Sequence, residues 1–131
     1  MLKSTLKKFD KSTDNALGKL NFTLKKLFTN AKTYVNYIIK YVWDSENIVI
    51  RIPHLFIGDK ISINLEWIYK EYRILIVVDK EDDKGKISAY CSKRLGEIKI
   101  FNMKINREDI EFRNFIKWVS KYFSVSWITN N

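Results

Sequence analysis

The chain has 131 residues and a formal net charge of +9, and 46% of its residues are hydrophobic. Because it has only four glycines and one proline, a collagen-like chain and a disordered chain are both excluded, and the length is typical of one domain with its own core. A single cysteine, Cys91, excludes an internal disulfide and a zinc site built from several thiols.

We therefore expect one α+β domain over residues 1–131, located in the cytoplasm, where the environment is reducing. The N-terminus has no uninterrupted apolar stretch of the kind found in signal peptides, and no apolar run approaches the ~20 residues of a membrane span. The four glycines form no phosphate-binding loop. The sequence thus predicts no nucleotide cofactor and no transmembrane segment.

Residues 1–43 have the pattern of a basic amphipathic helix. From Leu2 to Trp43 there are nine lysines and two aspartates, which together account for seven of the nine net positive charges. At about 100° per residue the lysines fall in one arc of the helical wheel, and the apolar residues fall in the opposite arc. The lysines are Lys3, Lys7, Lys8, Lys11, Lys19, Lys25, Lys26, Lys32 and Lys40. The apolar stripe is Leu2, Leu6, Phe9, Leu17, Leu20, Leu24, Leu27, Ala31, Val35, Ile38 and Val42.

The pattern leaves open whether this segment is one helix or two. Ser12, Thr13 and Asp14 are suitable N-caps for a helix that begins there, and Thr29 with Asn30 offers a second cap. An unbroken helix over 13–43 would be about 46 Å long, against roughly 30 Å for a small domain. Part of it would then overhang a core formed by residues 47–128 and would expose its apolar stripe.

After a polar break at residues 44–47 the hydrophobic period changes to two, which predicts strands. Short turns between the strands predict an antiparallel meander. The segment 72–78 is apolar at nearly every position, which favours a central strand covered on both faces. The five expected strands are 48–52, which Pro53 would end, and 61–67, 72–78, 86–91 and 97–103.

A second amphipathic helix follows, with Asn106 as the expected N-cap and Asp109 at its third position. A short sixth strand is expected at residues 124–128. Because the central strand is apolar on both sides, we expect one helix to cover each face of the sheet. The apolar face of this second helix consists of Phe112, Phe115, Ile116, Val119, Tyr122 and Phe123.

The lysine face is the strongest functional signal. A row of lysines on a rigid element matches a polyanion, because each neutralised phosphate releases counterions and adds affinity. The helix has no arginine, the usual reader of guanine, so recognition of sequence is not expected. The leading hypothesis is a non-enzymatic module that docks on nucleic-acid backbone without strong sequence specificity. The expected contact residues are Lys7, Lys8, Lys11, Lys19, Lys25, Lys26, Lys32 and Lys40.

Three other interpretations of this segment stay open. The lysines could form a merely solvated face, filled with Lys by the codon usage of an AT-rich genome. The apolar stripe could bind a protein partner or a second copy, as in a small inhibitor or interaction protein of an AT-rich genome or mobile element. A basic amphipathic helix could also lie on an anionic membrane surface.

Two further groups of residues are interpreted as structural. Trp67 and Tyr69 could stack on unpaired bases, but they continue the buried alternation of their strand, so core packing is expected. The carboxylates Asp79, Glu81, Asp82 and Asp83 lack the spacing of a calcium loop and lie among lysines, so we expect a solvated hairpin tip and no metal.

Catalysis has little support in the sequence. Glu97, Ile98 and Lys99, with Asp79 or Asp83 upstream, form a short pattern that resembles the Asp…(Asp/Glu)-X-Lys core of the PD-(D/E)XK nucleases and archaeal resolvases. That resemblance implies a Mg²⁺-dependent nuclease, which is kept as a minor alternative. The other candidate for catalysis is a nucleophile–base dyad of Cys91 and His54. Their side chains would have to meet in space, and we expect both residues to be structural.

Overall fold

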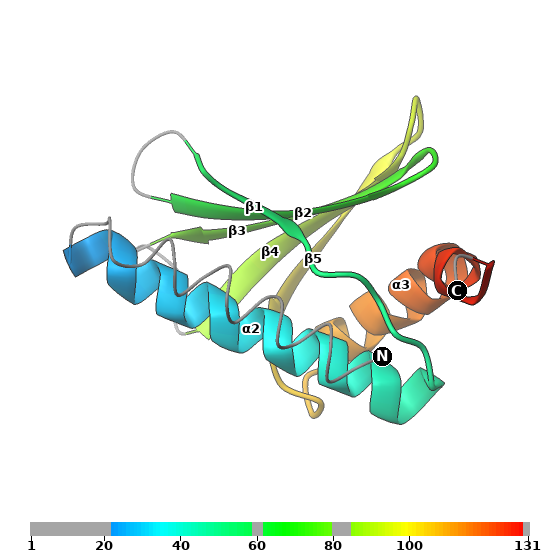
Figure 1. The fold of residues 1–131 in the computed structure, drawn as a ribbon, viewed down its shortest axis with the longest axis horizontal. Helices are drawn as coiled ribbons and strands as arrows, with labels where there is room; N and C mark the ends of the chain where they lie inside the picture. Colours follow the sequence, from blue (N-terminus) through cyan, green and yellow to red (C-terminus); the bar gives the residue numbers. More distant parts are fainter. Residues whose placement is uncertain (1–21, 59–61, 80–84, 130–131) are drawn as a thin grey trace.

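The structure is a computed structural model that describes residues 22–58, 62–79 and 85–129. Within these residues a five-stranded antiparallel sheet lies between two helices in the chain order, so the predicted α+β class is confirmed (Figure 1). The elements are α2 (Phe22–Glu46), β1 (His54–Ile57), β2 (Ser62–Tyr69), β3 (Tyr72–Asp79), β4 (Lys86–Lys93), β5 (Ile98–Lys104) and α3 (Ile110–Thr129).

Helix α2 runs without a break through Thr29 and Asn30, so the second helix start that the sequence allowed there does not occur. The Thr29 hydroxyl donates to the Lys25 carbonyl, 3.0 Å away, as a residue inside a helix does. The helix also continues into the expected polar break at residues 44–47 and ends at Glu46. Asn47 then takes a left-handed φ of 55°, and its N–H donates to the Trp43 carbonyl at 2.9 Å. An asparagine in this conformation is a common helix terminus.

The strands form a meander in the order β1-β2-β3-β4-β5, and every neighbouring pair is antiparallel. The last four predicted strands are confirmed, but the first is wrong, because residues 48–52 form no strand and β1 follows Pro53. Ile50 is buried in the core, and the Trp67 indole N–H donates to the Arg51 carbonyl at 2.7 Å. The alternation of this segment therefore reflects a connection that packs on the core rather than a strand of the ladder.

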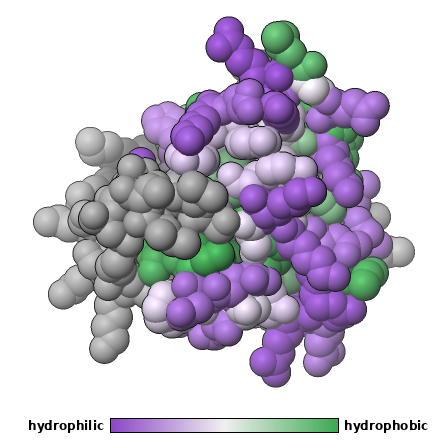
Figure 2. All heavy atoms as spheres, turned by 90° about the vertical axis from the view of Figure 1, so that its right-hand side faces the viewer, coloured by the Kyte–Doolittle hydropathy of each residue, from purple (hydrophilic) through white to green (hydrophobic). Residues whose placement is uncertain are grey.

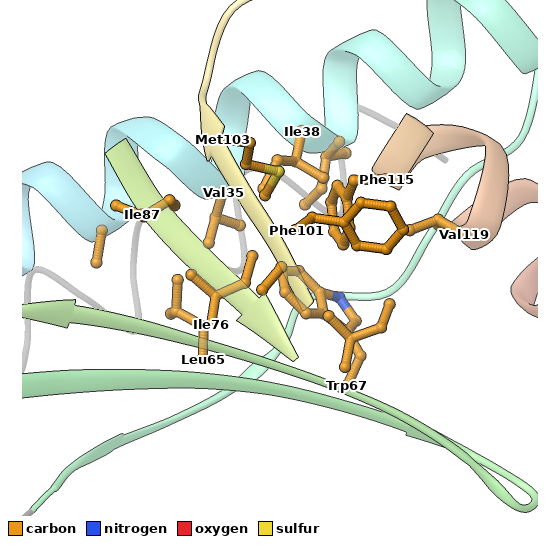
Figure 3. Packing of buried hydrophobic residues seen from close by; sticks show 14 of the residues in the cluster. Val35, Ile38, Leu65, Trp67, Ile76, Ile87, Phe101, Met103, Phe115 and Val119 are labelled. Carbon is orange, nitrogen blue, oxygen red and sulfur yellow. The ribbon is translucent and has the colours of Figure 1, made fainter. Parts of the chain in front are cut away.

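Both helices cover the same face of the sheet, which corrects the expectation of one helix on each face (Figure 1). Helix α2 packs on β2 and β3, and α3 packs on β5. Figure 3 shows Val35 of α2 and Phe115 of α3 among buried side chains from the strands. We call this side of the sheet the covered face. Its buried strand residues are Ile63, Leu65, Trp67, Ile74, Ile76, Val78, Ile87, Ala89, Cys91, Phe101 and Met103.

Helix α3 begins at Ile110 and is capped by Asp109, not by Asn106. The Phe112 N–H donates to the Asp109 carboxylate at 3.1 Å, whereas the Asn106 side chain accepts from the Glu108 N–H at 2.9 Å in the preceding turn. The predicted apolar face of α3 is buried, with Tyr122 partly exposed.

The predicted sixth strand is also wrong, because α3 continues to Thr129. Five alternating residues are too few to distinguish a strand from a helix by period. No glycine or proline separates residues 124–128 from the helix before them, so the helix simply extends.

The other side of the sheet carries no helix within the described residues, and we call it the open face (Figure 1). Its side chains come from the alternate positions of the same strands, such as Glu66, Leu75 and Tyr90. They mix polar, charged and aliphatic types. None of the described helices is long and apolar enough to cross a membrane.

Candidate polyanion-binding surface

Three of the predicted contact lysines, Lys25, Lys26 and Lys40, are exposed on α2. The buried residues of this helix, from Leu27 to Val42, face the sheet. At about 100° per residue, Lys26 and Lys40 lie on the side of the helix opposite those buried residues. They are separated by about 21 Å along the helix axis, at about 1.5 Å per residue. Both therefore face away from the sheet.

The other predicted lysines differ from these three. Lys32 is only partly exposed and already interacts with another group. Lys7, Lys8, Lys11 and Lys19 lie outside the described residues. The expected helix start at residues 12–14 also lies outside them.

Sequence reasoning missed two lysines on α3. Lys117 and Lys121 are exposed and lie opposite the buried residues of that helix, such as Phe115 and Val119. The Lys121 ammonium lies 5.2 Å from the centre of the Tyr122 ring. Since both helices cover the same face of the sheet, the outer sides of α2 and α3 belong to the same side of the molecule. The sequence shows that these two lysines lie on the polar face of α3. They were not added to the predicted surface because α2 and α3 were expected on opposite faces of the sheet.

We call Lys25, Lys26, Lys40, Lys117 and Lys121 the lysine surface. No carboxylate occurs in α2 before Asp44, so Lys25 and Lys26 have no acidic neighbour one turn away, whereas Asp44 lies one turn after Lys40 on the same side of the helix. None of the five forms an ion pair within the described part of the chain. The described carboxylates nearest in sequence lie at helix ends, at Asp44, Glu46, Glu108 and Glu111. The outer side of the helices therefore carries more positive than negative charge, and Asp44 is the acidic residue nearest to this surface along α2.

The apolar stripe of the helix is not available to a partner within α2. Leu27, Val35, Ile38 and Val42 are all buried against the sheet, and Leu24 packs against the same cluster. The expected overhang with a wet stripe is therefore not found in residues 22–46, and the earlier part of the stripe lies outside the described residues.

The aromatic residues that could have stacked on bases pack in the core, as predicted. Trp67 is 4% exposed on the covered face. Tyr69 is partly buried, with its ring centre 6.2 Å from that of Phe123. The Lys70 ammonium also lies 5.3 Å from the centre of the Tyr69 ring.

The histidine and the cysteine lie on opposite faces of the sheet. Cys91 is buried on the covered face, and burial raises the pKa of its thiol to about 12, although the nearby Lys99 charge lowers it. The thiol is therefore protonated at neutral pH. His54 is exposed on β1 and pairs with Glu66 of the open face. A catalytic dyad needs hydrogen-bond reach between its two side chains, and these two positions do not allow it.

The carboxylates of the nuclease-like pattern are also apart. Glu97 precedes Ile98, which lies opposite Ser92, itself opposite Arg73 of β3. Asp79 lies six residues beyond Arg73 on the same strand, or about 20 Å at ~3.3 Å per residue. Asp83 lies outside the described residues, as do Glu81 and Asp82. Among the described residues, no group of three or more His, Cys, Asp or Glu side chains could hold a metal ion.

Figure 2 views the molecule from the right-hand side of Figure 1. Hydrophilic residues cover most of the described surface on this side, and the hydrophobic areas between them are small. Comparison with protein-family models, curated proteins and solved structures found no match to this chain.

Proposed function

We propose that the protein is a non-enzymatic binding module that docks its lysine surface on the phosphate backbone of nucleic acid. The observation that carries this proposal is the set of exposed lysines on α2 that form no ion pair with a described residue, with Lys26 and Lys40 facing directly away from the core. A folded domain needs a polar face on such a helix, but it does not need lysines to outnumber acidic residues there, and before Asp44 the charged residues of α2 are all lysines.

The arrangement favours backbone contacts over contacts with bases. Lysine is a point charge on a flexible stem, which suits phosphates at varied positions, whereas arginine suits bidentate reading of guanine. Helix α2 has no arginine. On α3, Arg113 is partly buried, and its guanidinium donates to the Arg107 carbonyl at 3.1 Å. We therefore expect affinity that depends strongly on salt and weakly on sequence.

The test is a fluorescence anisotropy titration of a labelled random-sequence duplex with the full-length protein at several salt concentrations. Three to five phosphate contacts would give a log–log slope between about −2.7 and −4.5, at about 0.9 per contact. The double variant Lys26→Glu/Lys40→Glu should bind at least about tenfold more weakly at low salt and reduce the magnitude of the slope by about 1.8.

A matched control reverses two lysines on the other side of the molecule. Lys86 and Lys104 are exposed on the open face, so Lys86→Glu/Lys104→Glu changes the net charge by the same amount. This control should retain most of the affinity. Equal losses in both variants would mean that net charge alone drives binding, and unchanged affinity of Lys26→Glu/Lys40→Glu would contradict the proposal. Sedimentation with anionic vesicles, in place of duplex binding, would assign the surface to a membrane.

A further inference from the structure

A row of apolar side chains crosses the open face. Leu75 of β3 lies opposite Tyr90 of β4, and Tyr90 lies opposite Ile100 of β5. In the neighbouring row, Ile68 lies at the β2 end and Ile98 at the β5 end, with Arg73 and Ser92 between them. Ile68 is 65% exposed, Ile98 63% and Ile100 50%. These five residues form what we call the apolar row.

Leu95 extends this surface at one end. It is fully exposed in the turn between β4 and β5, with a left-handed φ of 65°. A branched residue such as leucine rarely adopts this conformation. The Arg94 N–H donates to the Glu71 carbonyl at 2.6 Å, which joins this turn to the turn between β2 and β3. The two turns are thus held together beside Ile68 and Ile98.

The charges around the apolar row leave an excess of cations. Three described carboxylates lie on this side: Glu66 pairs with Arg73, and Glu71 lies 3.4 Å from the Lys93 ammonium. Asp79, which the register of β3 and β4 places opposite Lys86, also interacts with another group. At the far end, Lys86 and Lys104 lie directly opposite each other across β4 and β5. Both are exposed, and neither forms an ion pair with any described residue. Like charges in this position destabilise a sheet unless an anion lies between them.

From this combination we infer that the open face docks an acidic partner protein, through a segment that carries aliphatic or aromatic side chains beside carboxylates. The apolar side chains of the partner would cover the apolar row and Leu95, and its carboxylates would lie near Lys86 and Lys104. Four strand spacings by about eight residues give the face a projected area of roughly 500 Å². That area suits one side of a small interface.

Other occupants fit this chemistry less well. Phosphodiester backbone has no apolar groups with which to bury three exposed isoleucines. A second copy would bring together two faces with the same excess of positive charge, in a chain whose net charge is +9. A partner with apolar side chains and carboxylates could cover the apolar row and also neutralise Lys86 and Lys104.

The test uses a random peptide library displayed on phage, selected against the full-length protein. We expect the enriched peptides to carry aliphatic or aromatic residues together with net negative charge. The strongest peptide is then synthesised, labelled and titrated by anisotropy. Ile98→Ser/Ile100→Ser should weaken its binding at least about tenfold, and Lys86→Glu/Lys104→Glu should weaken it several-fold and increasingly so at low salt.

Ile110→Ser is the matched control, because Ile110 is 56% exposed but lies at the start of α3. It should change the peptide affinity less than about twofold. Circular dichroism and urea unfolding establish that each variant is folded. No enrichment, enrichment without acidic residues, or equal binding by Ile98→Ser/Ile100→Ser would overturn the inference. The inference would also be overturned if the wild-type protein dimerised, or bound anionic vesicles, and only Ile98→Ser/Ile100→Ser lost that property. Duplex binding by the lysine surface is measured separately, so the two proposals stand or fall independently.

Discussion

The two faces of the sheet are built from the same strands but have different environments. On β3, Ile74, Ile76 and Val78 point to the covered face and are buried, whereas Leu75 and Val77 point to the open face and are partly exposed. Both sets are aliphatic. An apolar residue in a strand therefore indicates which positions can be buried, but only the placement of the helices decides which of them are.

The largest expected contrast between the faces concerns thiol accessibility at adjacent positions of β4. Cys91 is 1% exposed on the covered face, and Tyr90 beside it is 37% exposed on the open face. Cys91 should react with a thiol reagent only when the protein opens. The single cysteine of Tyr90→Cys/Cys91→Ala should react at least about 1000-fold faster. Comparable rates at pH 7, measured with an aromatic disulfide reagent, would mean that the covered face is open to solvent.

The same thiol predicts how stability depends on pH. Burial raises the pKa of Cys91 from 9.0 to about 12, so the unfolded chain loses this proton first as the pH rises. The contribution of Cys91 is therefore complete below pH 9 and is lost between about 9 and 12, by up to about 1.4 kcal/mol per unit. The difference in unfolding free energy between the wild type and Cys91→Ala isolates this effect from the titration of lysines and tyrosines. A difference that stays constant from pH 7 to 10.5 would contradict it.

Truncating neighbouring residues of β3 should separate the two faces energetically. Ile76 is fully buried, so Ile76→Ala should lower the unfolding free energy by about 2–5 kcal/mol. Leu75→Ala on the open face should cost about 1 kcal/mol or less. Urea unfolding of the two variants gives the comparison, and equal losses would show that the open face is covered as well.

The close packing of Gly58 against Asn64 can be tested by substitution. Gly58 lies in the connection between β1 and β2, at one end of the open face. A Cβ at Gly58 would overlap the Asn64 side-chain amide and would lie 2.7 Å from the Ser62 hydroxyl. Gly58→Ala should therefore destabilise the protein by about 1–3 kcal/mol. Adding Asn64→Ala should recover part of that loss, because the overlapping group is removed. A double variant with the sum of the two single losses would contradict this account.

The smallest effect concerns the cap of the helix that covers β5. The Asp109 carboxylate accepts from the Phe112 N–H at 3.1 Å and from the Lys104 N–H at 3.2 Å. Asp109→Ala should cost about 1 kcal/mol. Glu108→Ala is the control, because Glu108 is exposed and forms no ion pair with a described residue. If both variants lose the same stability in urea unfolding, Asp109 is not the cap.

Much of the fold could be predicted because its signals are local. The period of the apolar residues predicted the described part of α2, the last four strands and the buried face of α3, and the short turns predicted the antiparallel order. The errors arose where a local pattern has two solutions. Ile48, Ile50 and Ile52 alternate as in a strand, but they belong to a connection that packs on the core. The strand itself begins after Pro53, which lacks the N–H that a ladder needs. Residues 124–128 alternate too, but they extend α3.

The candidate site was only partly predictable, since a surface depends on how distant elements pack. The exposure of Lys26 and Lys40 follows from the helical wheel of one segment. The addition of Lys117 and Lys121 requires that α2 and α3 cover the same face, which no local pattern states. For the same reason the apolar row was missed, since Leu75, Tyr90 and Ile100 become neighbours only through the strand register.

The most direct test of the proposed function is the duplex titration with the two charge-matched variants side by side. The account predicts that Lys26→Glu/Lys40→Glu loses at least about tenfold in affinity at low salt, while Lys86→Glu/Lys104→Glu keeps most of it. No binding by the wild-type protein at low salt, or equal losses in the two variants, would contradict the assignment of the lysine surface to nucleic-acid backbone.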